Sequence, residues 1–254
     1  MSKSNEKVAV ITGATGGIGF EVAKRLGNDG FTVVLNGIED KAGAERVAEL
    51  TASGITAEYY GFDVTDENAV TSNINKIGEK YGKIDVLVNN AGGLGGRSRF
   101  EEMTTEFYRF VMALNLDSTF FASRAAIPFL KKSDYASIIN YTSNAGWNAG
   151  GPGAGIYGTS KAGVHAITRA LAKDLAEYGI RVNAVSPGTI DTPFHAQIKS
   201  TKPEVFASWA NSIMLGRLGQ PEDVAGVVSF LAGKDAAFLT AETIQIGGGQ
   251  ALGI

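Results

Sequence analysis

Short runs of apolar residues recur along the chain, separated by longer segments that mix apolar and polar residues. The runs are rich in valine and isoleucine and almost unbroken, which is typical of strands buried on both faces of a parallel sheet. The pattern predicts strands over Lys7–Thr12, Thr32–Asn36, Ala57–Val64, Ile84–Asn90, Ala136–Tyr141, Ile180–Ser186 and Thr243–Gly249.

Helix-length segments lie between these runs. Apolar residues recur in them at three- and four-residue steps, as in VAKRL and ITRALAKDLAEY. Helices are predicted over residues 19–29, 40–52, 66–82, 119–132 and 161–179, and from Pro221 onward. Alternating strands and helices indicate βαβ units with right-handed crossovers. We therefore expect an α/β fold: a single doubly wound Rossmann domain over residues 1–254, with a seven-stranded parallel sheet and helices on both faces.

Residues 193–218 interrupt the alternation. They hold His195 and Trp209 but no strand pattern, and they directly follow the carboxyl end of a predicted strand. Such a segment is typical of a lid or binding loop, and a plain surface insertion is the alternative. His195 either contacts a substrate there or has no role, whereas His165, on a predicted helix, is expected to be structural.

Composition and charge exclude several classes of protein. A net charge of −3 gives no reason to expect nucleic acid or an anionic membrane as a partner. The chain has no cysteine, which excludes disulfides, thiolate zinc sites and a cysteine nucleophile. No apolar run approaches the ~18 residues of a membrane span, and the first residues lack the apolar core of a signal peptide. We expect a cytoplasmic protein.

The stretch ITGATGGIG, residues 11–19, follows the first predicted strand and opens the first helix. Glycines at Gly13, Gly17 and Gly19 permit a tight turn and close approach of a ligand to the backbone. The following helix N-terminus offers free N–H groups and a positive dipole to a pyrophosphate. A simple tight connection is the alternative, but the place of this turn in a βαβ unit favours dinucleotide binding.

Tyr157 lies four residues before Lys161, behind the glycine-rich stretch GWNAGGPGAG. Residues four apart share a helix face, so both side chains point into one cleft if the chain is helical from Gly158 onward. The ammonium is expected to lower the pKa of the phenol from its usual value near ~10, toward the range useful for a general acid. An ordinary surface pair is the alternative, and the nearby dinucleotide turn favours catalysis.

Four motifs in order resemble the short-chain dehydrogenase/reductase family: T-G-x-x-x-G-x-G at residues 12–19, NNAG at 89–92, YGTSK at 157–161 and SPG at 186–188. The resemblance covers nearly the whole chain. It implies an oxidoreductase that acts on CH–OH groups, moves a hydride between a nicotinamide and a carbonyl carbon, and needs no metal ion. It also implies a homotetramer.

The resemblance assigns four catalytic residues. Tyr157 would donate a proton to the carbonyl oxygen, and Lys161 would hold the nicotinamide ribose and tune Tyr157. Ser143 would hydrogen-bond the substrate oxygen; it lies 14 residues before Tyr157, one more than the commonest family spacing, and Thr142 is its neighbour. Asn115 would open its helix to a water relay, or simply hydrogen-bond a neighbouring carbonyl.

The resemblance also implies the cofactor contacts, with Asp63 at the adenine and Thr192 over the nicotinamide amide. The full expected set is Gly13, Thr15, Gly16, Gly17, Ile18, Gly19, Gly37, Asp63, Val64, Asn90, Ala91, Gly92, Tyr157, Lys161, Pro187, Gly188, Ile190 and Thr192.

Residues around Gly37 bear on the choice of cofactor. NAD-preferring members carry an acid at this position, which is glycine here, and no basic residue follows it before Lys41. Because a 2′-phosphate needs a cationic partner and Glu39 would repel it, NADH is expected to be preferred, with NADPH as the alternative.

The segments GGPGAGIYGTSKAG and SPGTIDTPFHAQI resemble a branch that contains bacterial reductases of 4-deoxy-L-erythro-5-hexoseulose uronate, a product of alginate. Arg97 and Arg99 would receive the carboxylate of such a substrate, or would be solvated loop residues. Another sugar or polyol dehydrogenase, or a 3-oxoacyl carrier-protein reductase, is the alternative. A non-catalytic dinucleotide-binding regulator is disfavoured because Tyr157 and Lys161 are both present.

Overall fold

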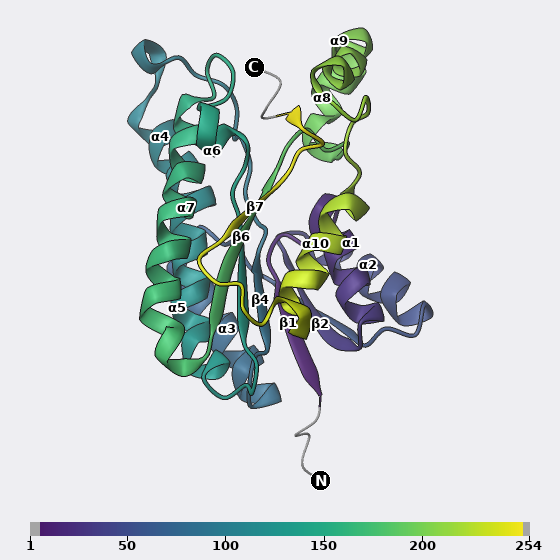
Figure 1. Ribbon diagram of the computed structural model, residues 1–254, viewed down its shortest axis with the longest axis vertical. Helices are drawn as coiled ribbons and strands as arrows, with labels where there is room; N and C mark the ends of the chain where they lie inside the picture. Colours follow the sequence, from purple (N-terminus) through teal and green to yellow (C-terminus); the bar gives the residue numbers. More distant parts are fainter. Residues whose placement is uncertain (1–5, 251–254) are drawn as a thin grey trace.

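A parallel sheet runs through the centre of the chain between two layers of helices (Figure 1). The computed structural model describes residues 6–250. Within that range the sheet has seven strands, in the order β3-β2-β1-β4-β5-β6-β7, so the predicted fold class is confirmed. The strands are β1 Lys7–Ile11, β2 Phe31–Gly37, β3 Ala57–Gly61, β4 Val86–Asn89, β5 Ser137–Tyr141, β6 Arg181–Pro187 and β7 Thr243–Ile246.

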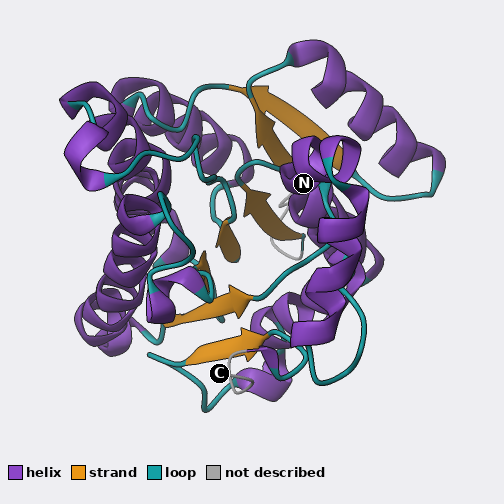
Figure 2. Cartoon of the chain, turned by 90° about the horizontal axis from the view of Figure 1, so that it is seen from above, coloured by secondary structure: helices purple, strands orange, loops and turns teal. Residues whose placement is uncertain are grey.

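Helices cover both faces of the sheet (Figure 2). Those longer than one turn are α1 Gly17–Asn28, α2 Asp40–Ala52, α3 Glu67–Tyr81, α4 Thr105–Met112, α5 Ser118–Leu130, α7 Gly155–Leu175, α8 Ala196–Thr201, α9 Pro203–Ser208 and α10 Pro221–Ala232. Short turns are α6 Ala145–Asn148, a π-helical turn at Ala113–Asp117, and 3₁₀ turns at Phe100–Glu102, Ala176–Tyr178, Pro193–His195, Trp209–Ser212 and Lys234–Ala236.

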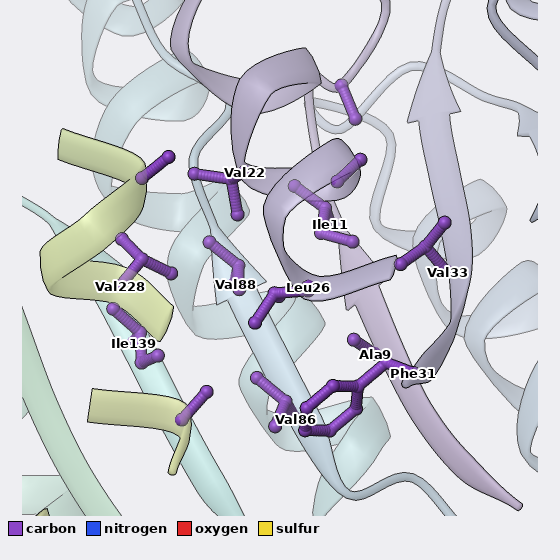
Figure 3. Close-up of a cluster of buried hydrophobic side chains, with 14 of the residues drawn as sticks. Ala9, Ile11, Val22, Leu26, Phe31, Val33, Val86, Val88, Ile139 and Val228 are labelled. Atoms are coloured by element: carbon purple, nitrogen blue, oxygen red, sulfur yellow. The ribbon is translucent and has the colours of Figure 1, made fainter. Parts of the chain in front are cut away.

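Two cores form because side chains alternate across each buried strand. Ala9 and Ile11 of β1 face α1 and α10, whereas Val8 and Val10 of the same strand face α3 and α5. Figure 3 shows the first core, in which Leu26 of α1 lies among strand side chains. This double burial explains why the strands read as unbroken apolar runs.

Several predicted boundaries were correct for local reasons. The helix predicted over residues 66–82 is α3, with the Asp66 side chain accepting hydrogen bonds from the amides of Asn68 and Ala69, and Gly82 at φ 79° ending it. The helix predicted from Pro221 begins there, with proline at its first position.

Other boundaries were wrong. The strand predicted to Val64 ends at Gly61. The strand predicted to Gly249 ends at Ile246, because three glycines form a turn after it. The helix expected from Gly158 begins three residues earlier, at Gly155. Residues 105–112, for which no helix was predicted, form α4.

The sheet reverses its direction of growth between β1 and β4. Ile11 of β1 pairs with Leu35 of β2 on one side and with Val88 of β4 on the other. Connections after β1 and after β4 therefore leave in opposite directions and open a crevice at the carboxyl edge of the sheet, which is where ligands bind in such folds.

Candidate active site

The glycine turn between β1 and α1 is packed so closely at two positions, Gly13 and Gly19, that side chains are excluded there. Gly13 has φ 63°, and a Cβ there would lie 2.9 Å from the Cα of Ala91. A Cβ at Gly19 would collide with the backbone oxygen of Gly13 and lie 2.5 Å from Nδ2 of Asn90. Gly16 is extended and open, with nothing within 4 Å of a Cβ placed on it.

Residues after β4 fasten this turn to the neighbouring strand. Asn90 donates from Nδ2 to the backbone oxygens of Thr12 (2.9 Å) and Gly13 (3.0 Å). The Thr12 hydroxyl accepts from the amides of Asn90 and Ala91, at 3.1 and 3.0 Å. The NNAG motif is therefore hydrogen-bonded to the T-G motif, and the end of β4 holds the turn before α1 in its conformation.

Lys161 is buried beneath the cleft on α7. Its Nζ donates a 2.9 Å hydrogen bond to the backbone oxygen of Tyr141, at the end of β5. A Cβ at Gly92 would lie 2.9 Å from this Nζ, so glycine at that position leaves room for the ammonium. Burial lowers the pKa of Lys161 to about 8, because the charged form loses its hydration.

Tyr157 lies one helical turn before Lys161, and Nζ is 5.9 Å from the centroid of its ring. Burial raises the pKa of Tyr157, and a hydrogen bond with the Ser143 hydroxyl lowers it in part. The net pKa shift of Tyr157 is therefore opposite to the expected one, because burial outweighs the hydrogen bond that lowers it. The two side chains do share a helix face, as the four-residue spacing predicted.

Ser143 and Tyr157 belong to one cluster despite the additional residue between them. Ser143 follows β5, and its hydroxyl accepts a 3.1 Å hydrogen bond from the amide of Ala145 at the start of α6. The short helix α6 and the glycines behind it accommodate the longer connection. Thr142, the alternative, instead donates to the backbone oxygen of Val185 at 3.0 Å and is 3% exposed.

Asn115 is fully buried in the π-helical turn between α4 and α5. Its Nδ2 donates to the backbone oxygens of Val111 and Gly93, both at 2.9 Å, and its Oδ1 accepts from the amide of Gly93 at 2.9 Å. The simpler expectation, a hydrogen bond to a neighbouring carbonyl, is confirmed. π-Helical turns occur frequently at functional sites, and this one lies where the resemblance implied a helix opened at Asn115.

A cleft of about 760 Å³ at the carboxyl edge of the sheet contains the glycine turn together with Ser143, Tyr157 and Lys161. Its lining includes the expected residues Gly13, Thr15, Gly16, Gly17, Ile18, Gly19, Asn90, Gly92, Ser143, Tyr157, Lys161, Pro187, Gly188, Ile190 and Thr192. Within the described chain, no arginine, aspartate or glutamate lines it.

Some expected residues lie outside this lining. Asp63 is exposed, and its Oδ1 accepts from the amide and hydroxyl of Thr65, both at 2.8 Å; the neighbouring Val64 is buried. Ala91 backs the glycine turn. Gly37 ends β2 under Thr15, whose Cγ2 would lie 2.5 Å from a Cβ there. The Thr15 side chain thus occupies the space that an acid at position 37 would need.

Arg46 is a residue near the site that the sequence did not reveal. From α2, its Nε donates to the backbone oxygen of Thr15 at 3.2 Å, and its guanidinium lies 4.6 Å from the centroid of the Phe20 ring. Its Nη1 pairs with Glu49 at 2.6 Å. A cation thus contacts the glycine turn, although the sequence near Gly37 offered none.

The two loop arginines do not line the cleft. Arg97 donates from Nη1 to the backbone oxygen of Pro152 at 2.8 Å, and its side chain is exposed; Arg99 is exposed as well. Of the two expectations for these arginines, this arrangement agrees with solvated loop residues and does not place them against a substrate carboxylate in the cleft.

The two histidines have different surroundings. His195 lines the cleft and lies among Phe194, Phe206 and Trp209, with ring centroids 4.9 to 5.8 Å away. Burial lowers its pKa. His165 packs on Trp147 with centroids 4.3 Å apart, away from the cleft lining, as expected for a structural residue.

Comparisons with known proteins identify the family. A profile described as "Enoyl-(Acyl carrier protein) reductase" matches residues 13–251. A diacetyl reductase [(S)-acetoin forming] from Staphylococcus aureus is 37% identical over 256 residues, covering 97% of this chain and 98% of that one. The chain belongs to the short-chain dehydrogenase/reductase family and is an NAD(P)-dependent oxidoreductase.

Two solved structures extend the comparison. A variant of actinorhodin polyketide ketoreductase with NADPH has a TM-score of 0.92 and 32% identity, covering 99% of both chains. An NADH-dependent reductase responsible for alginate metabolism has a TM-score of 0.87 and 35% identity, covering 98% of this chain and 99% of that one. Among residues 6–250, no helix combines the length and the apolar character needed to cross a membrane.

The residues present fit a dinucleotide. The glycine turn leaves open space at Gly16, at the N-terminus of α1, where free N–H groups favour an anion. The cleft continues from this turn to Tyr157 and Lys161. One cleft therefore holds both the N-terminus of α1, which favours an anion, and the phenol of Tyr157.

Proposed function

We propose that the chain reduces the carbonyl group of a small polar oxo compound with NAD(P)H, and that Tyr157 supplies the proton. The observation that carries the proposal is the convergence of Ser143, Tyr157 and Lys161 at one end of a cleft whose other end is the glycine turn. Ser143 lies in the loop after β5, and Tyr157 and Lys161 lie on α7.

When bound, the nicotinamide would supply the hydride that reaches the carbonyl carbon. The hydroxyls of Ser143 and Tyr157 bind the carbonyl oxygen, and Tyr157 donates its proton to that oxygen as negative charge develops there. The burial that raises the pKa of Tyr157 keeps the phenol protonated before this step. The Ser143 hydroxyl stabilises the phenolate afterwards.

Lys161 has two tasks in this scheme. Its ammonium, fixed by the backbone oxygen of Tyr141, would hold the nicotinamide ribose through its remaining N–H groups. It also stabilises the phenolate electrostatically, because a cation at short range is more effective in a buried site than in water. Asn115 keeps Gly93 and the π-helical turn together beside Lys161, where a water relay from the ammonium would begin.

The substrate proposed first is the oxo-sugar acid class, represented by 4-deoxy-L-erythro-5-hexoseulose uronate. The alginate-metabolism reductase among the similar structures supports it. Polar side chains that would face its hydroxyls include Asn144, Asn148 and Ser212, all in the cleft lining.

A second candidate is a neutral diketone or hydroxy ketone. The cleft lining has no arginine for a carboxylate, and Arg97 is engaged with Pro152. The diacetyl reductase relative supports this reading. A 3-oxoacyl carrier-protein substrate is the third alternative.

Absorbance at 340 nm separates these substrates. The protein is incubated with NADH or NADPH and with matched neutral and acidic compounds: diacetyl against pyruvate, a neutral oxo-hexose against the uronate, and an acetoacetyl thioester. A kcat/KM at least about tenfold higher for the uronate than for its neutral partner supports the first candidate, and the reverse ratio supports the second. Absence of turnover with every compound would reject the proposal and favour a non-catalytic regulator.

For the cofactor we propose that NADH is preferred. Glu39 and Asp40 follow the end of β2 and are exposed, so they would repel a 2′-phosphate. The NADH-dependent reductase supports this choice, whereas the ketoreductase with NADPH supports the alternative. Dissociation constants of both cofactors, measured by titration, decide between them.

We propose further that the protein is a cytoplasmic homotetramer. Tyr108 and Phe110 of α4 and Phe120 of α5 are between 39% and 48% exposed, which is typical of surfaces that another subunit covers. Light scattering that gives the mass of a single chain would reject the tetramer.

A further inference from the structure

The glycine turn after β7 places Gln250 in the cleft lining, where its side chain contacts residues that are distant in sequence. Its Oε1 accepts a 2.9 Å hydrogen bond from the amide of Thr189, and its Nε2 donates to the Thr189 hydroxyl at 2.9 Å. The same Nε2 lies 3.3 Å from the hydroxyl of Ser212, and Nδ2 of Asn144 lies 3.5 Å from Oε1. One side chain thus contacts three separate segments.

These three segments form the substrate side of the cleft. Thr189 follows β6, Ser212 ends the 3₁₀ turn Trp209–Ser212 in the segment of residues 193–218, and Asn144 is adjacent to Ser143. All three residues, and Gln250 itself, line the cleft. A single amide therefore connects the segment over the cleft with the loop that carries the hydroxyl of Ser143.

Glycines make this close approach possible. A Cβ at Gly188 would lie 2.8 Å from Oε1 of Gln250, and a Cβ at Gly249 would lie 2.6 Å from Sδ of Met214. Gly248 and Gly249 have φ values of 57° and 85°, which favour glycine. The turn IGGGQ is thereby shaped to pack on residues 212–215, and the amide of Leu215 donates to the oxygen of Gly248 at 3.1 Å.

The two ends of the 193–218 segment are joined to each other by contacts in which Gln250 takes no part. Ile190 pairs with Gly219 in a parallel bridge, Asp191 donates from its amide to the oxygen of Gly219 at 2.8 Å, and Lys199 pairs with Asp191 at 2.8 Å. These contacts hold the base of the segment. Gln250 and the glycine turn hold the later part of the segment, at Ser212 and Leu215.

We propose that Gln250 is a positioning residue. It fastens the later part of the 193–218 segment, at Ser212, to the turn after β6 and to the loop of Ser143. It thereby holds the carbonyl substrate against Ser143 and Tyr157 without taking part in proton transfer. The inference on substrate binding rests on the proposed function, whereas the inference on the segment's stability does not.

Hydrogen–deuterium exchange with the full chain tests the structural part. Gln250→Leu removes every bond of the amide, and Ser212→Ala removes only the partner on the segment. Gln245→Leu is the matched control, because Gln245 is an exposed amide on β7. We expect exchange of the amides of residues 209–216 to be about tenfold faster in Gln250→Leu, less accelerated in Ser212→Ala and unchanged in the control.

Steady-state kinetics tests the functional part. The expected result for Gln250→Leu is a KM for the carbonyl substrate raised about fivefold or more, with kcat within about threefold and the cofactor dissociation constant within about twofold. If wild-type protein turns over no carbonyl compound, the proposed function fails while the exchange result still decides the role of Gln250.

Two results would overturn the inference. The first is exchange over residues 209–216 that is the same in Gln250→Leu and in the control. The second is a fall in kcat with KM unchanged, which would place Gln250 in the chemical step. If Gln250→Leu fails to fold, Ser212→Ala decides: unchanged exchange in that variant also overturns the inference.

Discussion

The buried ammonium of Lys161 is hydrogen-bonded to the backbone oxygen of Tyr141, at 2.9 Å, and not to the phenol of Tyr157. The end of β5 therefore fixes the cation, and Tyr157 stands beside it on the same helix face with its ring centroid 5.9 Å from Nζ. Each group is held by its own strand or helix, so the geometry of the pair depends on the packing of α7 against β5.

Burial of Lys161 predicts a dependence of stability on pH. The folded protein releases this proton near pH 8, because burial lowers the pKa to about 8, whereas an unfolded lysine releases it near ~10.4. Between these values the unfolded state binds more protons, so the free energy of unfolding rises with pH. The penalty of burying the charge is fully present below pH 8.

Denaturant titrations of wild-type protein and Lys161→Met at about pH 7.5 and pH 10 measure this effect. The free energy of unfolding of wild type, relative to the variant, is expected to increase by up to about 3 kcal/mol between the two conditions. An unchanged difference would show that Lys161 keeps an ordinary pKa in the fold.

A pair of glycine substitutions tests the geometry of the turn before α1. Gly19→Ala forces a Cβ against Gly13 and Asn90, and is expected to destabilise the fold by about 1–3 kcal/mol and to weaken cofactor binding. Gly16→Ala adds the same atom in open space on extended backbone, so the free energy of unfolding should stay within about 0.5 kcal/mol of wild type. Equal losses in thermal or denaturant unfolding would contradict the close packing at Gly19.

Arg46 predicts a difference between the two cofactors. It contacts the backbone of Thr15, beside Gly37, and is a cationic group that could pair with a 2′-phosphate at this end of the turn. Arg46→Gln is expected to weaken NADPH about three- to tenfold and NADH less than about twofold, a difference of up to ~1.4 kcal/mol. Fluorescence titration gives both dissociation constants, and Lys41→Gln on the same helix is the control. Equal weakening of both would mean that Arg46 only supports the turn.

Tyr141 carries a buried hydroxyl that has no hydrogen-bond partner among the described residues. Burial raises the pKa of this phenol strongly. Because an unsatisfied buried polar group is unfavourable, Tyr141→Phe is expected to raise the free energy of unfolding of the cofactor-free protein by about 1 kcal/mol. Tyr178→Phe, at a side chain that is 46% exposed, is the control. A loss of stability in Tyr141→Phe would show that its hydroxyl is satisfied in solution.

Much of the fold could be predicted because its signals are local. Strands such as Phe31–Gly37 are buried on both faces and therefore read as apolar runs, and Asp66 and Gly82 mark the ends of α3 directly. The four-residue spacing of Tyr157 and Lys161 was enough to place them on one helix face.

The remaining features depend on contacts that no local pattern encodes. The π-helical turn at Asn115 is stabilised by Gly93, which lies 22 residues away. Arg46 reaches Thr15 across 31 residues, and Gln250 reaches Asn144 across 106. The pKa of Tyr157 was misjudged for a similar reason: spacing revealed its cationic neighbour but not the burial that opposes it.

The most direct test of the account is single-turnover oxidation of NADH by Tyr157→Phe, followed at 340 nm with the best carbonyl substrate of wild-type protein. If Tyr157 is the proton donor, the rate falls at least about 10³-fold below wild type. The NADH dissociation constant changes less than about threefold, because only the proton donor is removed. Turnover close to the wild-type rate would contradict the assignment of Tyr157 as the acid.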